Sequence, residues 1–335
     1  MQVFRGIAAL AVVAHHAALS TDAFVQSLPG GWLRVFDLGA FGVDFFFVLS
    51  GFIIMHAHRG EVGNPAATRI YLGKRLARIF PAYWPIGLSM LGLYAALPGF
   101  SASGGREFSV LSSVLLLPMD LPPALSVAWT LVHELLFYTV FMLWFISRPA
   151  FWYGLALWAS AILAVQFFGE ATGWLGYPMS LLNLEFMLGV LAASYYGRAS
   201  LRFCTAMMVA GGLLASVMLF LLYAGYAAGH RLGLALGLAA MMYGIARWEQ
   251  HRAIAWPLML MAIGNASYSI YLVHNPLLSL TQRLAGQQGM TWPLALFAGM
   301  VISVICGYLY YLWVERPALR LFRGYWLHAP RCQLS

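Results

Sequence analysis

Long runs of apolar residues alternate with short polar gaps along almost the whole chain. A helix needs about 20 mainly apolar residues to cross the hydrocarbon core of a bilayer, allowing for tilt. Runs of this kind lie at 4–20, 38–58, 80–98, 127–147, 151–168, 177–196, 203–225, 230–247, 257–283 and 291–314. The pattern therefore predicts an all-α polytopic membrane protein with about ten transmembrane helices. A further stretch, 108–118, is too short to count as a span.

The composition agrees with this pattern and excludes several other classes of protein. Of the 335 residues, 62% are hydrophobic and 9% are charged, whereas a soluble domain has about 25% charged residues. The net charge of +8 does not indicate nucleic-acid binding, because the basic residues fill the gaps between apolar runs and form no basic face on a soluble fold. The three cysteines are scattered, without the paired spacing of disulfide frameworks or zinc motifs.

The basic residues of the gaps predict the orientation of the chain. An even number of spans places both termini on the same side, and fifteen of the 19 Lys and Arg residues fall on that side. Only Arg34, Arg106, Arg231 and Arg283 fall on the other side. Because cytoplasmic loops carry the excess of Lys and Arg, we expect both termini to be cytoplasmic.

The first apolar run, RGIAALAVVAHHA, contains three ionisable residues. Arg5 and His16 are eleven residues apart, so they share a helix face to within about 20° and lie roughly 16 Å apart along the axis. Glu134, in the run 127–147, lies about 10 Å below the outer surface, which is nearly the level that His16 reaches from the cytoplasmic side. A histidine and a carboxylate at one depth could form a general-base dyad. The alternatives are a buried pair that only holds helices together, or two groups that never meet.

Other polar residues also lie at membrane depth, where ionisable groups are costly and often functional. They include Asp44, Glu185 and His274. Small polar or glycine residues such as Ser50, Gly51, Ser267 and Ser269 are typical of close helix packing. No two histidines have the i, i+4 spacing that puts two metal ligands on one helix face, so we expect no metal site.

A basic cluster, KRLARIFPAYW, precedes the run 80–98. Arg75 and Arg78 are three residues apart and can share a helix face, which forms a forked set of donors suited to phosphate groups. We expect Pro81 to begin the third helix on the cytoplasmic side. Anchoring of the helix by the positive-inside rule is the alternative explanation for these basic residues.

Together these segments resemble the acyltransferase 3 family of integral membrane acyltransferases. The resemblance lies in RGIAALAVVAHH, GVDFFFVLSGF, RLARIFPAYW and WTLVHELLFY, with weaker similarity in LEFMLGV, SYSIYLVH and ERP. The segments run in the family's order from Arg5 to Pro317, and WTLVHE is most similar to the exopolysaccharide branch. The resemblance implies an acyltransferase domain at 1–317, followed by a short cytoplasmic tail at 318–335.

The resemblance also implies an activity and a set of site residues. The reaction moves an acyl group, most simply acetyl, from cytoplasmic acyl-CoA to a hydroxyl of an exopolysaccharide, O-antigen or lipid-linked sugar, in the bacterial inner membrane. His16 and Glu134 match the catalytic positions, and Arg5, Arg75 and Arg78 match positions that handle the donor. Acetyl-CoA would be a cosubstrate, with no bound cofactor, and other polysaccharide-assembly proteins are potential partners. The expected supporting residues are Asp44, Ser50, Tyr83, Trp129, His133, Tyr138, Glu185 and His274.

The chain departs from the family pattern at position 133, where it has His133 and the family commonly has Val or Tyr. We expect this histidine to share or perturb the charge of Glu134. The role of His16 has two versions: it deprotonates the acceptor hydroxyl, or it carries the acyl group itself. Two other functions also fit parts of the sequence. One is a transporter of a glycan or acyl donor that uses His16 and Glu134 as a proton relay, and the other is a non-catalytic scaffold.

Overall fold

The computed structural model describes residues 1–97, 107–195, 197, 199–226, 230–251 and 256–327. Over these ranges every regular element is helical, and seven helical segments are long and apolar enough to cross a membrane. The predicted all-α polytopic membrane protein is therefore confirmed at this level. Arg106 lies outside the described residues, and the predicted tail 318–335 is described only as far as residue 327.

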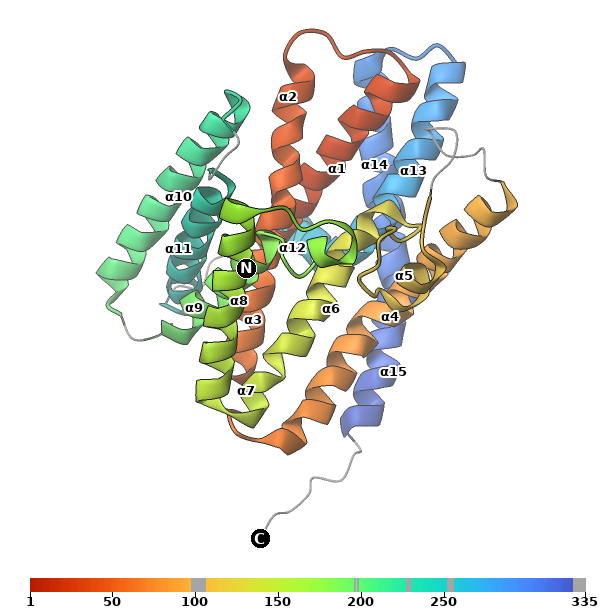
Figure 1. The fold of residues 1–335 in the computed structure, drawn as a ribbon. Helices are drawn as coiled ribbons and strands as arrows, with labels where there is room; N and C mark the ends of the chain where they lie inside the picture. Colours follow the sequence, from red (N-terminus) through yellow and green to blue (C-terminus); the bar gives the residue numbers. More distant parts are fainter. Residues whose placement is uncertain (98–106, 196, 198, 227–229, 252–255, 328–335) are drawn as a thin grey trace.

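Each apolar run predicted from the sequence coincides with a helix or a pair of helices (Figure 1). They are α1 Gln2–Phe24, α3 Gly42–His58, α4 Pro65–Ala96, α6 Trp129–Phe141 with α7 Leu143–Ile146, α8 Arg148–Phe168, α9 Leu182–Tyr195, α10 Leu201–Tyr223, α11 His230–His251, α12 Leu258–Asn265 with α13 Ser267–Gln287, and α14 Trp292–Tyr310. The short stretch 108–118 contains only the six-residue helix α5, Val110–Leu115. By length and hydropathy, α9, α11 and α13 are not among the seven apolar segments.

Helix α4 begins much earlier than the sequence predicted. It starts at Pro65, after the cap Asn64, and continues through Pro81 and Pro85 without ending. A proline inside a helix removes one backbone hydrogen bond. The Tyr268 and Tyr310 hydroxyls, from α13 and α14, donate to carbonyl oxygens on either side of Pro81, at 3.0 and 2.7 Å, and hold this part of α4 against those helices. Pro81 is thus not the start of the helix, and the basic cluster lies inside it.

The last two predicted runs also differ from single straight spans. The run 257–283 is divided at Ala266 into α12 and α13. Helix α12 packs against the first turns of α1, where Gly6 and Gly264 allow close approach because a Cβ at either would collide with backbone of the other helix. Helix α14 continues through a π-helical turn, Tyr311–Glu315, into α15, Arg316–Leu327.

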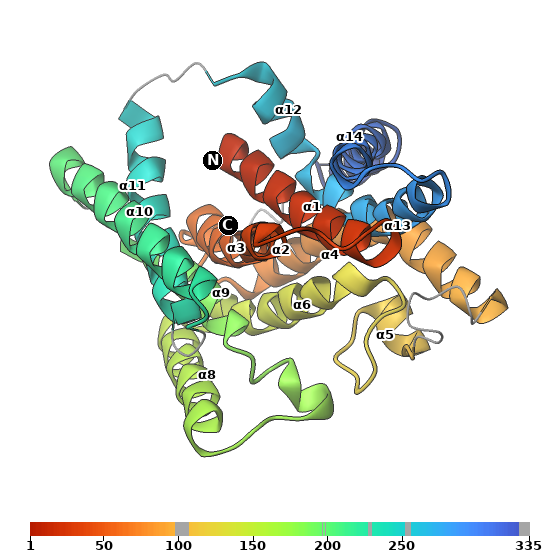
Figure 2. The same ribbon diagram turned by 90° about the horizontal axis from the view of Figure 1, so that it is seen from above.

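Helix α1 lies at the centre of the fold, with α12, α13 and α14 on one side and α3 on the other (Figure 2). Helices α3 and α9 pack very closely, because Gly51 faces the Phe186 carbonyl and Gly189 faces the Val48 carbonyl, where any Cβ would collide. This confirms the predicted packing role of Gly51 and brings the backbones of the two helices together. The pair α10 and α11 flanks this core, and α4 and α6 form its remaining wall (Figures 1 and 2).

Candidate functional site

A cavity of about 100 Å³, partly open to solvent, lies between α1, α3, α4, α6 and α13. Along α3 its wall extends from Val43 to Ile54, a distance of about 16 Å for eleven helical residues. Most of the wall is apolar, with a few converging polar groups, which is the usual character of a small-molecule site. Six of the residues predicted for the site line it: Arg5, Ser50, Arg75, Arg78, Glu134 and Tyr138.

Arg5 is part of this cavity wall and is more than an interfacial arginine at the end of a span. Its Nη2 donates to the Ser267 hydroxyl at 3.0 Å, while its buried Nε has no hydrogen-bond partner among the described residues. Ser267, which the sequence suggested only as a small packing residue, thus positions this guanidinium group. A guanidinium group with an unused donor in a cavity wall is suited to binding an anion.

Arg75 and Arg78 both line the cavity, as their three-residue spacing within α4 predicts. The Arg75 guanidinium lies 5.5 Å from the ring centres of Tyr71 and Tyr138, and its Nη2 is 3.3 Å from His58 Nε2. His58 is held in turn by Glu61, whose carboxylate is 2.7 Å from Nδ1. The Glu61 carboxylate can only accept, so Nδ1 carries the hydrogen of the neutral ring, and His58 Nε2 is then an acceptor that orients Arg75.

Arg78 has a different environment, with no hydrogen bond to any other described residue. Its charge instead interacts through space with the carboxylates Glu134 and Glu315, and it repels Arg5. Three guanidinium groups and the Glu134 carboxylate line the cavity, and the Glu315 carboxylate lies near enough to interact with Arg78 and Arg5. Three positive and two negative charges leave one positive charge and several unused N–H donors for an anionic ligand.

Glu134 is fixed within the cavity by two hydroxyl groups, one from its own helix α6 and one from α3. Tyr138, one turn further along α6, donates to Glu134 Oε1, and the Ser50 hydroxyl of α3 donates to the same oxygen at 3.3 Å. The Ser50 hydroxyl thus has a polar role besides helix packing. No hydrogen bond or ion pair joins Glu134 to His16 among the described residues, so of the alternatives that the sequence left open the direct dyad is not formed here.

His16 pairs with a second histidine across the α1–α13 contact. Its Nδ1 is 3.0 Å from the Val12 carbonyl oxygen and 3.3 Å from Nε2 of His274, which is fully buried. Neither ring lines the cavity. Tyr271 connects the two regions, since its side chain lines the cavity and its ring centre lies 5.6 Å from that of His274.

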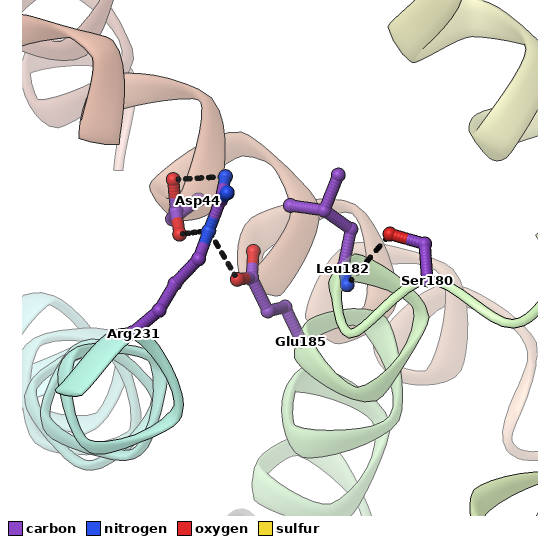
Figure 3. Close-up of polar contacts among 5 residues, drawn as sticks. All are labelled: Asp44, Ser180, Leu182, Glu185 and Arg231. Atoms are coloured by element: carbon purple, nitrogen blue, oxygen red, sulfur yellow. Dashed lines mark hydrogen bonds and ion pairs between the residues drawn. The ribbon is translucent and has the colours of Figure 1, made fainter. Parts of the chain in front are cut away.

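Asp44 and Glu185, both fully buried, meet Arg231 at the beginnings of α3, α9 and α11 (Figure 3). Arg231 donates from Nε to Asp44 Oδ1 at 2.7 Å and from Nη2 to Oδ2 at 3.1 Å, and its Nε is 3.6 Å from Glu185 Oε1. Arg231 was assigned to an outer gap from the sequence, without a partner. The structure gives it a structural role, as the cation between two buried carboxylates of other helices.

Replacing Arg231 by methionine is expected to destabilise the fold by about 3 kcal/mol, because it leaves two buried carboxylates without their cation. Thermal unfolding of the purified protein in detergent measures this loss. The exposed Arg34 supplies a matched control, R34M, which should change stability little. In the triple variant D44N/E185Q/R231M most of the stability should return. A triple variant as unstable as R231M would contradict this explanation.

The remaining predicted residues lie outside the cavity. The Tyr83 hydroxyl donates to the Ser113 carbonyl at 2.6 Å, so this buried tyrosine connects α4 to α5. Trp129 packs against Phe47 and His133. His133, which we expected to share or perturb the charge of Glu134, has its Nδ1 3.4 Å from Asn183 Oδ1.

Sequence reasoning missed several residues of the cavity region, among them Thr130, Tyr268 and Tyr271. The Tyr271 hydroxyl is 2.9 Å from the Thr130 hydroxyl and 3.0 Å from the Val127 carbonyl. Glu315, noted only as part of a weak motif, accepts from the Ser269 hydroxyl at 2.5 Å. It lies in the π-helical turn, a type of irregularity that is frequent at functional sites and could not be read from the apolar pattern.

Comparisons with known proteins agree with the resemblance noted in the sequence. The family model described as "Acyltransferase domain", of the acyltransferase 3 family, matches residues 1–312. The exopolysaccharide production protein ExoZ of Rhizobium meliloti (strain 1021) is 30% identical over 86% of this chain and 92% of its own length. The acyltransferase MdmB of Streptomyces mycarofaciens is 26% identical over 95% of this chain and 90% of its own. No solved structure matches the chain.

Proposed function

This chain belongs to the acyltransferase 3 family and is a membrane O-acyltransferase, and from that premise we propose its substrates and its site. The donor is a cytoplasmic acyl-CoA, most simply acetyl-CoA, and the acceptor is a hydroxyl of an exopolysaccharide, O-antigen or lipid-linked sugar. The similarity to a protein named for exopolysaccharide production supports this acceptor class. The observation that carries the proposal is the cavity in which Arg5, Arg75, Arg78 and Glu134 converge.

The proposed topology has ten spans, with both termini on the cytoplasmic side of the bacterial inner membrane. The excess of basic residues on that side supports this orientation. In Figure 1 the lower end of the fold carries the α3–α4 connection, α7 and the end of α15 together, and the N-terminus lies near the middle of the view. The acyltransferase domain extends to Pro317, and 318–335 form the cytoplasmic tail.

The donor enters at the end of the cavity nearest His58. Arg75 lies at that end, and Arg78 has unused N–H donors deeper inside, so the two guanidinium groups bind phosphates of CoA. The predominantly apolar wall further along α3 then accommodates the pantetheine and the acyl chain. This places the thioester toward Tyr271, on the side of the cavity nearest the His16–His274 pair.

The chemical step uses His16 as the general base. His16 Nε2 takes the proton of the acceptor hydroxyl, and the oxygen attacks the thioester carbonyl carbon. The C–S bond then breaks, the acyl group stays on the acceptor oxygen, and the CoA thiolate takes the proton back from His16. Glu134 keeps the neighbouring arginines in place and does not contact the imidazole ring.

Purified protein in detergent should transfer label from [14C]acetyl-CoA to a lipid-linked oligosaccharide or polysaccharide acceptor. A transporter gives no labelled product without a sealed compartment, so product formation separates the two functions. Boiled protein and acceptor-free mixtures are the controls. Complete absence of labelled glycan with a panel of acyl-CoA donors and bacterial polysaccharides would contradict the proposed substrates, and restoration of polysaccharide production by an inactive variant would favour the scaffold.

A further inference from the structure

The protonation state of the His274 ring follows from its backbone contacts. Its Nδ1 lies 2.7 Å from the Tyr271 carbonyl oxygen and 3.2 Å from the Ile270 carbonyl oxygen, both within its own helix α13. Carbonyl oxygens only accept hydrogen bonds, so Nδ1 must carry a hydrogen. In the neutral ring, Nε2 is then left as an acceptor, and it is this atom that faces His16.

The same reasoning applies to His16. Its Nδ1 faces the Val12 carbonyl oxygen at 3.0 Å and His274 Nε2 at 3.3 Å, and both of these atoms accept. A hydrogen on His16 Nδ1 satisfies them, whereas the other tautomer would direct a lone pair at two lone pairs. His16 Nε2 is therefore the bare, basic nitrogen, and it has no hydrogen-bond partner among the described residues.

His15 has a different role, although its ring centre is only 4.9 Å from that of His16. Its Nδ1 faces the Asp37 carboxylate at 3.3 Å, at the outer edge of the fold. The contact with His274 therefore distinguishes His16 from its neighbour. Among the residues that the structure describes, no carboxylate contacts the His16–His274 pair, so its hydrogen-bond pattern rests on the two rings and three backbone carbonyls.

We propose that His274 is a positioning residue that holds His16 in the Nδ1–H tautomer, so that Nε2 takes the proton of the acceptor hydroxyl. This inference rests on the proposed function of His16. It gives α13 a defined part in the reaction: when His16 becomes protonated, its Nδ1–H still has the neutral His274 Nε2 as acceptor. A buried imidazole acceptor thus serves where many general-base histidines use a carboxylate.

Glutamine and asparagine at position 274 test this geometry as a matched pair. The amide oxygen of glutamine reaches the place of Nε2, whereas that of asparagine reaches only the place of Nδ1. We expect H274Q to keep kcat within about 3-fold of the wild type, while H274N and H274A lose about 10- to 100-fold. The KM for the acyl donor should change little in all three, because His274 lies outside the cavity. Equal loss in H274Q and H274N, or full activity in H274A, would overturn the proposal.

A spectroscopic measurement tests the tautomer without relying on activity. Solid-state NMR of ¹⁵N-histidine-labelled protein in lipid bilayers identifies which ring nitrogen of His16 carries hydrogen, with H16Q assigning the signal. The wild type should show only the Nδ1–H form, and H274A should show a mixture of both forms. A wild-type signal from the Nε2–H form would refute the role of His274. A correct tautomer with unimpaired H16A activity would instead refute the proposed catalytic function of His16.

Discussion

Replacing His16 by alanine is expected to lower the rate of acyl transfer about 1,000-fold while the protein remains folded in the membrane. The reason is that His16 Nε2 is the proposed acceptor of the hydroxyl proton, and general-base catalysis contributes about 10²–10⁴-fold. The fold should persist, because the His274 ring keeps its hydrogen bonds to carbonyl oxygens of its own helix. Initial rates with labelled acyl-CoA, together with the melting temperature in detergent, measure the two effects separately.

The adjacent histidine supplies the matched control for this experiment. His15 lies on the same helix and contacts the His16 ring, yet its Nδ1 faces Asp37. H15A should therefore keep the transfer rate within about 3-fold, since it removes similar volume without removing the proposed base. If both alanine variants retained activity, His16 would not be the base, and if both lost it equally, the effect would come from packing of α1.

The sequence allowed a good prediction of the helices because hydrophobic length constrains a membrane protein strongly. Backbone polar groups in lipid must be satisfied internally, so each apolar run becomes a helix. The predicted start of α4 was wrong because Pro81 resembles a helix-opening proline, whereas in the structure α4 continues through it and is held next to it by tyrosine hydroxyls of α13 and α14. Local sequence does not contain those contacts.

The composition of the site was more predictable than its pairing. Helical spacing placed Arg75 and Arg78 on one face, whereas depth placed Glu134 at the level of His16; the structure has the two arginines and Glu134 in one cavity wall. Depth alone cannot distinguish partners at a similar level, however. The His16–His274 contact joins residues 258 positions apart, and the Arg231–Asp44 contact joins residues 187 positions apart, so packing determines both.

The structure separates the proposed donor site from the proposed base. The arginines and Glu134 lie in the cavity, and the His16–His274 pair lies beyond Tyr271. Variants of the two groups should therefore affect different kinetic constants: those of the cavity change binding of the donor, and those of the histidine pair change the chemical step. A split of this kind is not expected of a proton-relay transporter, in which both groups would serve the same transport cycle.

Replacing both Arg75 and Arg78 by alanine is expected to lower kcat/KM for the acyl-CoA donor about 1,000-fold, mainly through KM. Each guanidinium group offers charge-assisted hydrogen bonds to phosphate worth about 1.5–3 kcal/mol, which corresponds to roughly 10–100-fold for one arginine. The KM for the glycan acceptor should change by less than about 3-fold, because the acceptor reaches His16 from the other side. Steady-state kinetics with each substrate varied separately give both constants.

Two further variants make this donor test specific. Arg69, exposed on the same helix α4, supplies the control R69A, which should leave the KM for the donor unchanged, since positive charge near the membrane surface is not sufficient for phosphate binding. In R78K the charge next to Glu134 and Glu315 remains, but the forked geometry is lost, so its KM should lie between those of the wild type and R78A. A uniform increase in KM for both substrates, or an R69A effect equal to that of R78A, would show that these arginines act through overall charge or folding.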